Sequence, residues 1–257
     1  HPLLVFADSD IPEAAITRLC QDAKQHDFYA VCVRPQYVQL AKSILENTSV
    51  QVATVIGFPE HKEDLIAQQK TPTIGQFSLA HKLDEARFSI ASGADELDWV
   101  LPVAQFKTET QAIPETAIAT LYETELKSHY PKTLAELEAA VAISTSRTPK
   151  ALPVKVIIET DLLSESERIL ATRLCILAEA HQARIAQVKT STGMLAGGQG
   201  ATPDAITTIA KTLQQFDSTG RMGIKASGGV KTREQALKLV ELGATRIGTS
   251  NGMALLQ

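Results

Sequence analysis

Eight short runs with the composition of β-strands alternate with helical patterns along the chain, and this alternation restricts the folds that it can adopt. Such alternation favours parallel strands joined by right-handed crossovers. The runs that we expect to form strands are 2–6, 29–33, 51–57, 96–101, 154–159, 185–190, 223–227 and 245–249. The segments that we expect to form helices are 12–26, 35–46, 77–92, 112–146 (as two helices), 164–181, 203–216, 232–242 and 252–256.

The number of strands and the chain length decide between two architectures built from such units. A chain of 257 residues is typical of one closed α/β barrel. No Gly-x-Gly-x-x-Gly follows the first expected strand, which disfavours a dinucleotide-binding sheet. We therefore predict an α/β fold, a single-domain (β/α)8 TIM barrel over residues 1–257, with helical elaboration around 103–152.

Composition and charge exclude several classes of partner. The formal net charge is −4 without a dominant basic field, so we expect no nucleic acid. No apolar run approaches the ~20 residues that cross a membrane, so we expect no membrane partner. The cysteines Cys20, Cys32 and Cys175 form no metal-binding pair and no disulfide framework, which is typical of a reducing, cytoplasmic setting.

The first residues, HPLLVFADSD, lack the features of a secretory leader. They contain no basic n-region and no initiator Met. We therefore expect no signal peptide.

Four charged side chains fall on the strand faces that should fill the barrel interior. Successive side chains point to opposite faces of a strand, and one face of a barrel strand meets the helices while the other faces inward. In four strands an apolar face opposes a face that carries Asp98 (with Glu96), Lys155, Lys189 or Lys225. One such lysine would usually reach solvent or form a structural ion pair. Charges on four strands favour a functional interior cluster, because buried charges are rare unless they are paired or used.

Two of these lysines indicate amine chemistry. Lys189 and Lys225 lie near the C-terminal ends of adjacent strands, where barrel enzymes build active sites. A lysine with a pKa of ~10.4 is almost fully protonated at neutral pH and cannot attack a carbonyl. Burial and a neighbouring ammonium lower that pKa, so one lysine can attack while the other stays charged. Asp98 can then shuttle protons or orient a water. Strand alternation does not say which lysine attacks.

Small-residue turns after the last strands indicate an anion site. The turns are 190–193, 226–229 and 248–252. Backbone N–H groups at helix N-termini bind anions, and barrels often hold phosphate at the last two βα loops. Each turn alone is also ordinary turn chemistry, but together, beside a lysine pair, they predict a phosphate site. We expect 195–200 (LAGGQG) to be either a loop over the mouth or a plain linker.

These motifs resemble the deoxyribose-phosphate aldolase family. The resemblance is carried by KTSTG at 189–193, GIKASGGVKT at 223–232, SGADELDWV at 92–100, VKVIIET at 154–160, TRIGTSNG at 245–252 and AVCVRPQYV at 30–38. It covers most of the chain from about residue 12 onward. It implies a class I, Schiff-base aldolase of deoxynucleoside breakdown, a lyase that works without metal or cofactor. The expected reaction is the reversible cleavage of 2-deoxy-D-ribose 5-phosphate to D-glyceraldehyde 3-phosphate and acetaldehyde.

The resemblance also implies roles for individual residues. Lys189 would form the Schiff base, Lys225 would perturb the pKa of Lys189, and Asp98 would be the proton-relay acid. The residues that would line the site or hold the phosphate are Lys155, Cys32, Thr192, Gly193, Gly228, Gly229, Ser250 and Asn251. Cys32 is equally well explained as a small buried hydrophobe.

Two departures from the family pattern keep other functions open. His1-Pro2 replace a different first strand, and Met194 stands where some relatives have a basic residue, so phosphate binding would depend on backbone donors. One alternative is another phosphate-binding barrel aldolase or isomerase, which we do not expect to combine Asp98 with both lysines. A second alternative is a catalytically inactive barrel with a binding role. The expected partner is a sugar phosphate, and a homodimer is compatible with the sequence.

Overall fold

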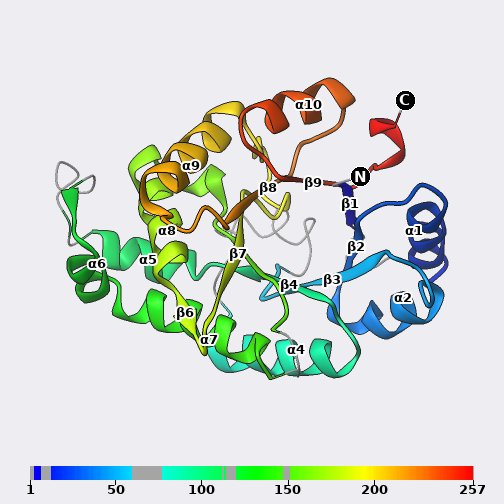
Figure 1. The fold of residues 1–257 in the computed structure, drawn as a ribbon, viewed down its shortest axis with the longest axis horizontal. Helices are drawn as coiled ribbons and strands as arrows, with labels where there is room; N and C mark the ends of the chain where they lie inside the picture. Colours follow the sequence, from blue (N-terminus) through cyan, green and yellow to red (C-terminus); the bar gives the residue numbers. More distant parts are fainter. Residues whose placement is uncertain are drawn as a thin grey trace.

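Eight parallel strands close into a ring in the part of the chain that the computed structural model describes, residues 3–6, 13–59, 77–111, 113, 120–146 and 151–256 (Figure 1). Each strand pairs with the next, β9 pairs with β1, and β5 pairs with β7. The strands are β1 (Leu3–Phe6), β2 (Ala30–Val33), β3 (Gln51–Ile56), β4 (Glu96–Val100), β5 (Val154–Ile157), β7 (Ala183–Lys189), β8 (Gly223–Ser227) and β9 (Arg246–Thr249). The predicted (β/α)8 TIM barrel is confirmed.

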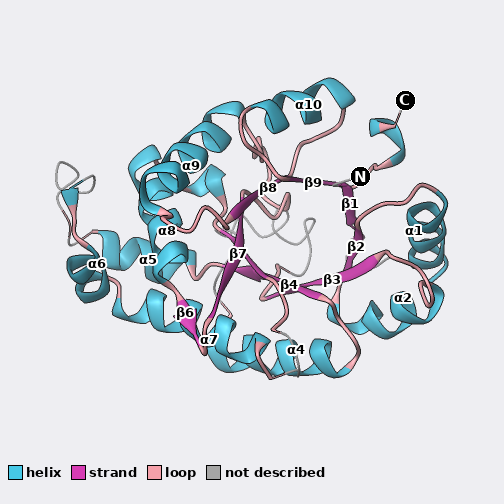
Figure 2. Ribbon diagram, viewed as in Figure 1, coloured by secondary structure: helices cyan, strands magenta, loops and turns pink. Residues whose placement is uncertain are grey.

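Helices surround the ring on the outside (Figure 2). The α-helices are α1 (Glu13–Gln25), α2 (Val38–Ile44), α4 (Leu79–Ala91), α5 (Val103–Thr110), α6 (Glu123–His129), α7 (Pro131–Ser144), α8 (Glu165–Leu177), α9 (Pro203–Phe216) and α10 (Arg233–Glu241). Short 3₁₀ turns follow three of the strands, η1 (Pro35–Tyr37), η3 (Thr160–Leu162) and η4 (Met253–Leu255). No helix among these described segments is long and apolar enough to cross a membrane.

The helix expected at 164–181 is shorter than predicted. Its start is correct, because the Ser164 side chain accepts the Glu167 N–H and the Glu167 carboxylate accepts the Ser164 N–H. It ends at Leu177, after which β6 (Glu179–Ala180) runs antiparallel to the start of β7. His181 and Gln182, with φ of 49° and 65°, form the two-residue turn. Two left-handed residues in succession match the twist of a tight hairpin, so the hairpin replaces the last helical turn.

Other boundaries also differ from those expected. The helix expected at 252–256 is only the turn η4, and the one expected at 35–46 begins as the turn η1. Within 112–146 the structure describes α6 and α7, which Pro131 separates at the first position of α7. The helix α5 lies before that range but inside 103–152, where helical elaboration was expected without assigned bounds. Residues 112, 114–119 and 147–150 lie outside the described segments.

A buried ion pair lies between the barrel wall and the helices. The Lys82 Nζ of α4 is 2.6 Å from Glu136 Oε1 of α7 and donates to the Val100 carbonyl at 2.8 Å. Trp99 Nε1 donates to the same Glu136 oxygen at 3.1 Å. Lys82 is fully buried, so Glu136 is the partner that makes its charge tolerable there. Burial lowers the pKa of Lys82, while Glu136 opposes that shift.

We predict that Glu136→Ala lowers the free energy of unfolding by about 3 kcal/mol, because it leaves the Lys82 charge buried without its partner. Urea denaturation checks this. Glu241→Ala is the matched control, since Glu241 forms an exposed pair with Lys238 at 3.4 Å, and its loss should change stability by at most about 0.5 kcal/mol. Equal effects of the two substitutions would contradict the claim that Glu136 compensates the buried charge of Lys82.

Candidate active site

One carboxylate gathers three lysines inside the barrel. Asp98 Oδ2 lies 2.8 Å from Lys189 Nζ and 2.6 Å from Lys225 Nζ, and Asp98 Oδ1 lies 2.8 Å from Lys155 Nζ. All four side chains are at most 3% exposed. The structure therefore brings together the four charged residues that strand alternation predicts as an interior cluster.

Strand register explains why these side chains meet. Asp98 is paired with Lys155 across β4 and β5, and Lys189 is paired with Lys225 across β7 and β8. The pairing of β5 with β7 then places the two couples side by side. Gly248 of β9 leaves room for the cluster, because a Cβ there would stand 3.1 Å from Lys225 Cε.

The charges shift one another's proton affinities. Burial and the neighbouring Lys189 lower the pKa of Lys225 to about 8, although Asp98 opposes the change. Burial alone would raise the pKa of Asp98, but Lys155, Lys189 and Lys225 hold it well below its usual value. Asp98 is therefore ionised at neutral pH. Because both lysines share one oxygen, the proton lost at mildly alkaline pH is a property of the lysine pair.

Lys155 has the opposite environment from Lys225. Burial would lower the pKa of Lys155, but Asp98 and Glu96 together raise it above its usual value. Lys155 Nζ lies 2.6 Å from Glu96 Oε2 as well as 2.8 Å from Asp98 Oδ1. Lys155 therefore stays protonated between two carboxylates, which makes it a fixed cation and not a nucleophile.

Cys32 belongs to the wall of this cluster. Its thiol is fully buried in β2 and lies 3.9 Å from Asp98 Oδ2. Burial and Asp98 raise the pKa of Cys32, so the thiol stays neutral. Cys32 is therefore a buried side chain beside the charged cluster, and its role as a pocket residue stays a prediction.

The turns that follow β7 and β8 meet at the C-terminal end of the barrel. A Cβ on Gly228, whose φ is 86°, would stand 3.4 Å from the Cα of Gly193 and 3.2 Å from that of Gly200. Only glycine allows backbones to approach this closely at such a φ. Gly229 lies beside the Gln199 carbonyl in the same place. The predicted anion turns at 190–193 and 226–229 therefore form one backbone surface.

The turn after β9 joins this surface. Thr249 Oγ1 donates to the Val230 carbonyl at 2.9 Å, which ties the end of β9 to the residue after Gly229. Ser250 and Asn251 are exposed, and Asn251 Oδ1 accepts the Ala254 N–H. Because only the three-residue η4 follows, anion binding here would depend on the turn itself and not on a helix terminus.

The stretch 195–200 is a loop that docks on the glycine turns. Asp161 Oδ1 accepts the Gln199 N–H at 3.1 Å, and its Oδ2 accepts the Gly200 N–H at 2.8 Å. The Ala201 N–H donates to the Gly228 carbonyl at 3.0 Å. Of the two expectations, the loop beside the mouth agrees with these contacts, and the plain linker does not.

Glu159 is a site residue that the sequence analysis did not select. It follows β5 with a left-handed φ of 56°, and its Oε2 accepts the Thr192 N–H at 3.1 Å and the Thr192 hydroxyl at 2.5 Å. Its Oε1 is buried without a hydrogen-bond partner among the described residues. Its place two residues after Ile157, on the inward parity of β5, was the available signal. Glu159 thus holds Thr192, and Thr192 Oγ1 in turn accepts the Met194 N–H at 3.1 Å.

The two departures from the family pattern have different outcomes. Met194 is 3% exposed, so its side chain packs inside and supplies no charge to the mouth. His1-Pro2 lie outside the described segments.

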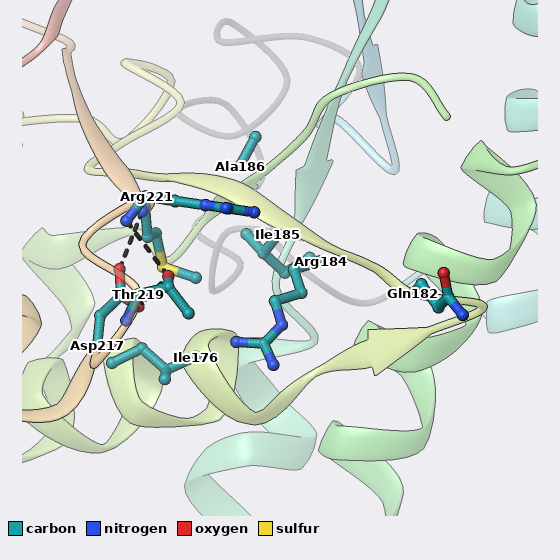
Figure 3. A pocket seen from close by; sticks show the side chains of 9 residues that line it. Ile176, Gln182, Arg184, Ile185, Ala186, Asp217, Thr219 and Arg221 are labelled. Atoms are coloured by element: carbon teal, nitrogen blue, oxygen red, sulfur yellow. Dashed lines mark hydrogen bonds between the residues drawn. The ribbon is translucent and has the colours of Figure 1, made fainter. Parts of the chain in front are cut away.

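A cavity lies away from the lysines. It has a volume of about 620 Å³ and is lined by Arg184 and Ile185 near the start of β7, by Ile176 of α8, and by residues of the loop before β8 (Figure 3). Lys189 is at the opposite end of β7. The polar groups of this cavity are engaged locally, because Asp217 accepts the N–H groups of Thr219 and Met222, and Arg184 pairs with Glu179. It is therefore not the site of the lysine chemistry.

No group of three or more His, Cys, Asp or Glu side chains is placed to hold a metal ion within the described ranges. The charges of the site come instead from lysines around a carboxylate.

Comparison with known proteins agrees with this geometry, although no family model matches the chain. Deoxyribose-phosphate aldolase 1 of Oceanobacillus iheyensis is 37% identical over 96% of this chain and 90% of its own length. The deoxyribose-phosphate aldolase of a Geobacillus species is 35% identical over all of this chain and 92% of its own. The tetrameric deoxyribose phosphate aldolase of Aeropyrum pernix superposes with a TM-score of 0.72 at 26% identity, over 99% of this chain and 88% of that one. With near-complete coverage at this identity, the chain belongs to the deoxyribose-phosphate aldolase family.

Proposed function

We propose that this protein is a class I aldolase that reversibly cleaves 2-deoxy-D-ribose 5-phosphate to D-glyceraldehyde 3-phosphate and acetaldehyde. The observation that carries the proposal is the shared contact of Lys189 and Lys225 with Asp98 Oδ2. Schiff-base chemistry needs a neutral amine at neutral pH, and a second buried ammonium is the means to obtain one. An inactive barrel with a binding role gains no support from a site that keeps all three groups in contact.

The first step forms the covalent intermediate. Lys189 Nζ attacks the C1 aldehyde carbon of the open-chain sugar, and the resulting carbinolamine loses water to give an iminium. The family resemblance assigns the attack to Lys189, since both amines contact the same oxygen. That shared oxygen also lets a proton pass between the lysines, so the neutral form can be delivered to Lys189 while Lys225 keeps the charge.

The second step breaks the bond between C2 and C3. Its electron pair moves into the iminium to form an enamine, while the C3 hydroxyl loses its proton and becomes the aldehyde of glyceraldehyde 3-phosphate. The ionised Asp98 accepts hydrogen bonds from the hydroxyl or from a water that carries this proton. Protonation of the enamine at C2 and hydrolysis then release acetaldehyde and restore the Lys189 amine.

The substrate phosphate would bind where the glycine turns meet. We assign it to the backbone surface of Gly193, Gly228 and Gly229, with Thr192 beside it and the turn of Ser250 and Asn251 at its edge. Met194 is buried and carries no charge, so the phosphate would be bound by backbone N–H groups, which can bind an anion without a basic side chain. Lys155 adds a fixed positive charge inside the barrel, beside Asp98.

A homodimer is compatible with the sequence, and one solved relative is described as tetrameric. The cysteines Cys20, Cys32 and Cys175 are free and buried, which agrees with a cytoplasmic location.

The Schiff base can be trapped chemically. We predict that acetaldehyde followed by borohydride leaves an ethyl adduct on Lys189, detected by mass spectrometry of peptides, because the reduced imine is stable. Lys189→Leu should lose that adduct. Lys238→Leu, which changes an exposed lysine of α10, should keep it. A folded wild-type protein that gains no adduct in the site would refute the proposed aldolase.

The role of Lys225 predicts a particular pH dependence. Because the pKa of Lys225 is lowered to about 8, the lysine pair loses one proton only as the pH rises through that region. The kcat/KM for cleavage should therefore fall as the pH drops below about 8. Lys225→Met should move this acid limb to higher pH and reduce kcat at pH 7 on the order of 100-fold, since the neighbouring charge is gone.

Lys225→Arg is the matched variant for this experiment, because it keeps a positive charge beside Asp98. It should retain the acid limb at lower pH than Lys225→Met does. An acid limb at the same pH in both variants would mean that the charge of Lys225 has no part in activating the nucleophile.

A further inference from the structure

The charges of the active site continue toward the other end of the barrel. Glu96 lies two residues before Asp98 on the same face of β4 and is 3% exposed. Its Oε2 contacts Lys155 Nζ at 2.6 Å and Arg246 Nη1 at 3.2 Å. The sequence of contacts from the lysine pair through Asp98, Lys155 and Glu96 to Arg246 therefore alternates in sign at every step.

Arg246, at the far end of this series of contacts, is held by an aromatic ring. The guanidinium carbon of Arg246 lies 3.6 Å from the ring centroid of Tyr29, and the Tyr29 hydroxyl donates to Glu96 Oε1 at 3.3 Å. Arg246 Nη1 also reaches that oxygen at 3.4 Å. Both oxygens of Glu96 are thus engaged, so its carboxylate has one defined orientation toward Lys155.

Lys155 transmits this orientation to the catalytic carboxylate. It contacts Glu96 on one side and Asp98 Oδ1 on the other, so Oδ1 is occupied and Oδ2 is left for the two lysines. Without Glu96, Asp98 would be the one remaining counter-charge of a buried ammonium. The carboxylate would then be drawn toward Lys155 and away from the pair that it serves.

This series of contacts also sets the balance of charge in the barrel interior. Among the described residues, the cations Lys155, Lys189, Lys225 and Arg246 outnumber the carboxylates of Asp98, Glu96 and Glu159, and this excess favours a neutral amine in the pair. In the described part of the chain, the charged or titratable groups that face the lysine pair or Glu96 are Asp98 of β4, Lys155 of β5, Cys32 of β2, Glu159 after β5, Arg246 of β9 and Tyr29 before β2.

We propose that Glu96 and Arg246 are positioning residues for the aldolase reaction, which hold Lys155 against Asp98 and set how readily the lysine pair releases a proton. This inference rests on the proposed function. Neither residue touches the sites of bond formation assigned above, since both act through Lys155. A purely structural ion pair would instead affect only folding stability.

Two substitutions that remove charges of opposite sign distinguish a positioning role from a purely structural one. Glu96→Gln removes a negative charge, so it should shift the acid limb of kcat/KM to lower pH by roughly half to one pH unit. Arg246→Gln removes a positive charge and should shift the limb to higher pH by a similar amount. In both variants kcat at the optimum should fall about tenfold, because Asp98 is no longer held in one position.

Glu241→Gln is the control, since it removes the same kind of charge from an exposed pair on α10 and should leave the limb in place. If Glu96→Gln does not fold, Arg246→Gln carries the test, with Arg246→Lys expected to restore the wild-type limb by restoring the charge. Limbs that do not move, or that move in the same direction in both folded neutral variants, would overturn the inference. Wild-type cleavage and the trapped Lys189 adduct are measured alongside, so that a failure of the aldolase assignment is recognised separately.

Discussion

The active site depends on one buried carboxylate that serves three ammonium groups. Asp98 makes the burial of Lys155, Lys189 and Lys225 tolerable, and its Oδ2 holds two of them within 2.8 Å. Without Asp98 the interior would contain unpaired charges, whose desolvation a domain of this size could not support. With Asp98 present, the three lysines still outnumber it, and this excess of positive charge lowers the pKa of one lysine of the pair.

The barrel supplies what this arrangement requires. Parallel strands place their alternate residues inside, and the ring brings residues that are 57 to 127 positions apart into direct contact with Asp98. Helices cover the outer faces of the strands (Figure 2). The glycine turns lie at the C-terminal ends of β7 and β8, the strands that carry Lys189 and Lys225, and we propose that the substrate phosphate binds there. Glu159 and Asp161 hold these turns in place from the end of β5.

Much of this was predictable because two periodicities, that of the alternating elements and that of the strand faces, are local in the sequence. They indicate the barrel and place Asp98, Lys155, Lys189 and Lys225 on one surface. Partners set by long-range contacts were not predictable, which is why Arg246 was missed although Glu96 had been placed on the correct face. Glu159 was passed over although the alternation of β5 puts it on the inward side. The hairpin at His181-Gln182 was missed because two residues with positive φ replaced a helical turn without a glycine to mark it. The division of labour between Lys189 and Lys225 comes from the family resemblance, since geometry places both on the same oxygen.

The central claim is that the shared carboxylate oxygen and the neighbouring ammonium groups make one lysine of the pair unusually acidic. Titration of the lysine side chains by nuclear magnetic resonance, with isotope-labelled lysine and assignment by Lys225→Met, tests it without any substrate. The account predicts that the pair loses one proton with a pKa of about 8, so that a signal of the wild-type protein that titrates there is absent or displaced in Lys225→Met. A pair whose signals titrate only near the ordinary value of 10.5 would contradict the account.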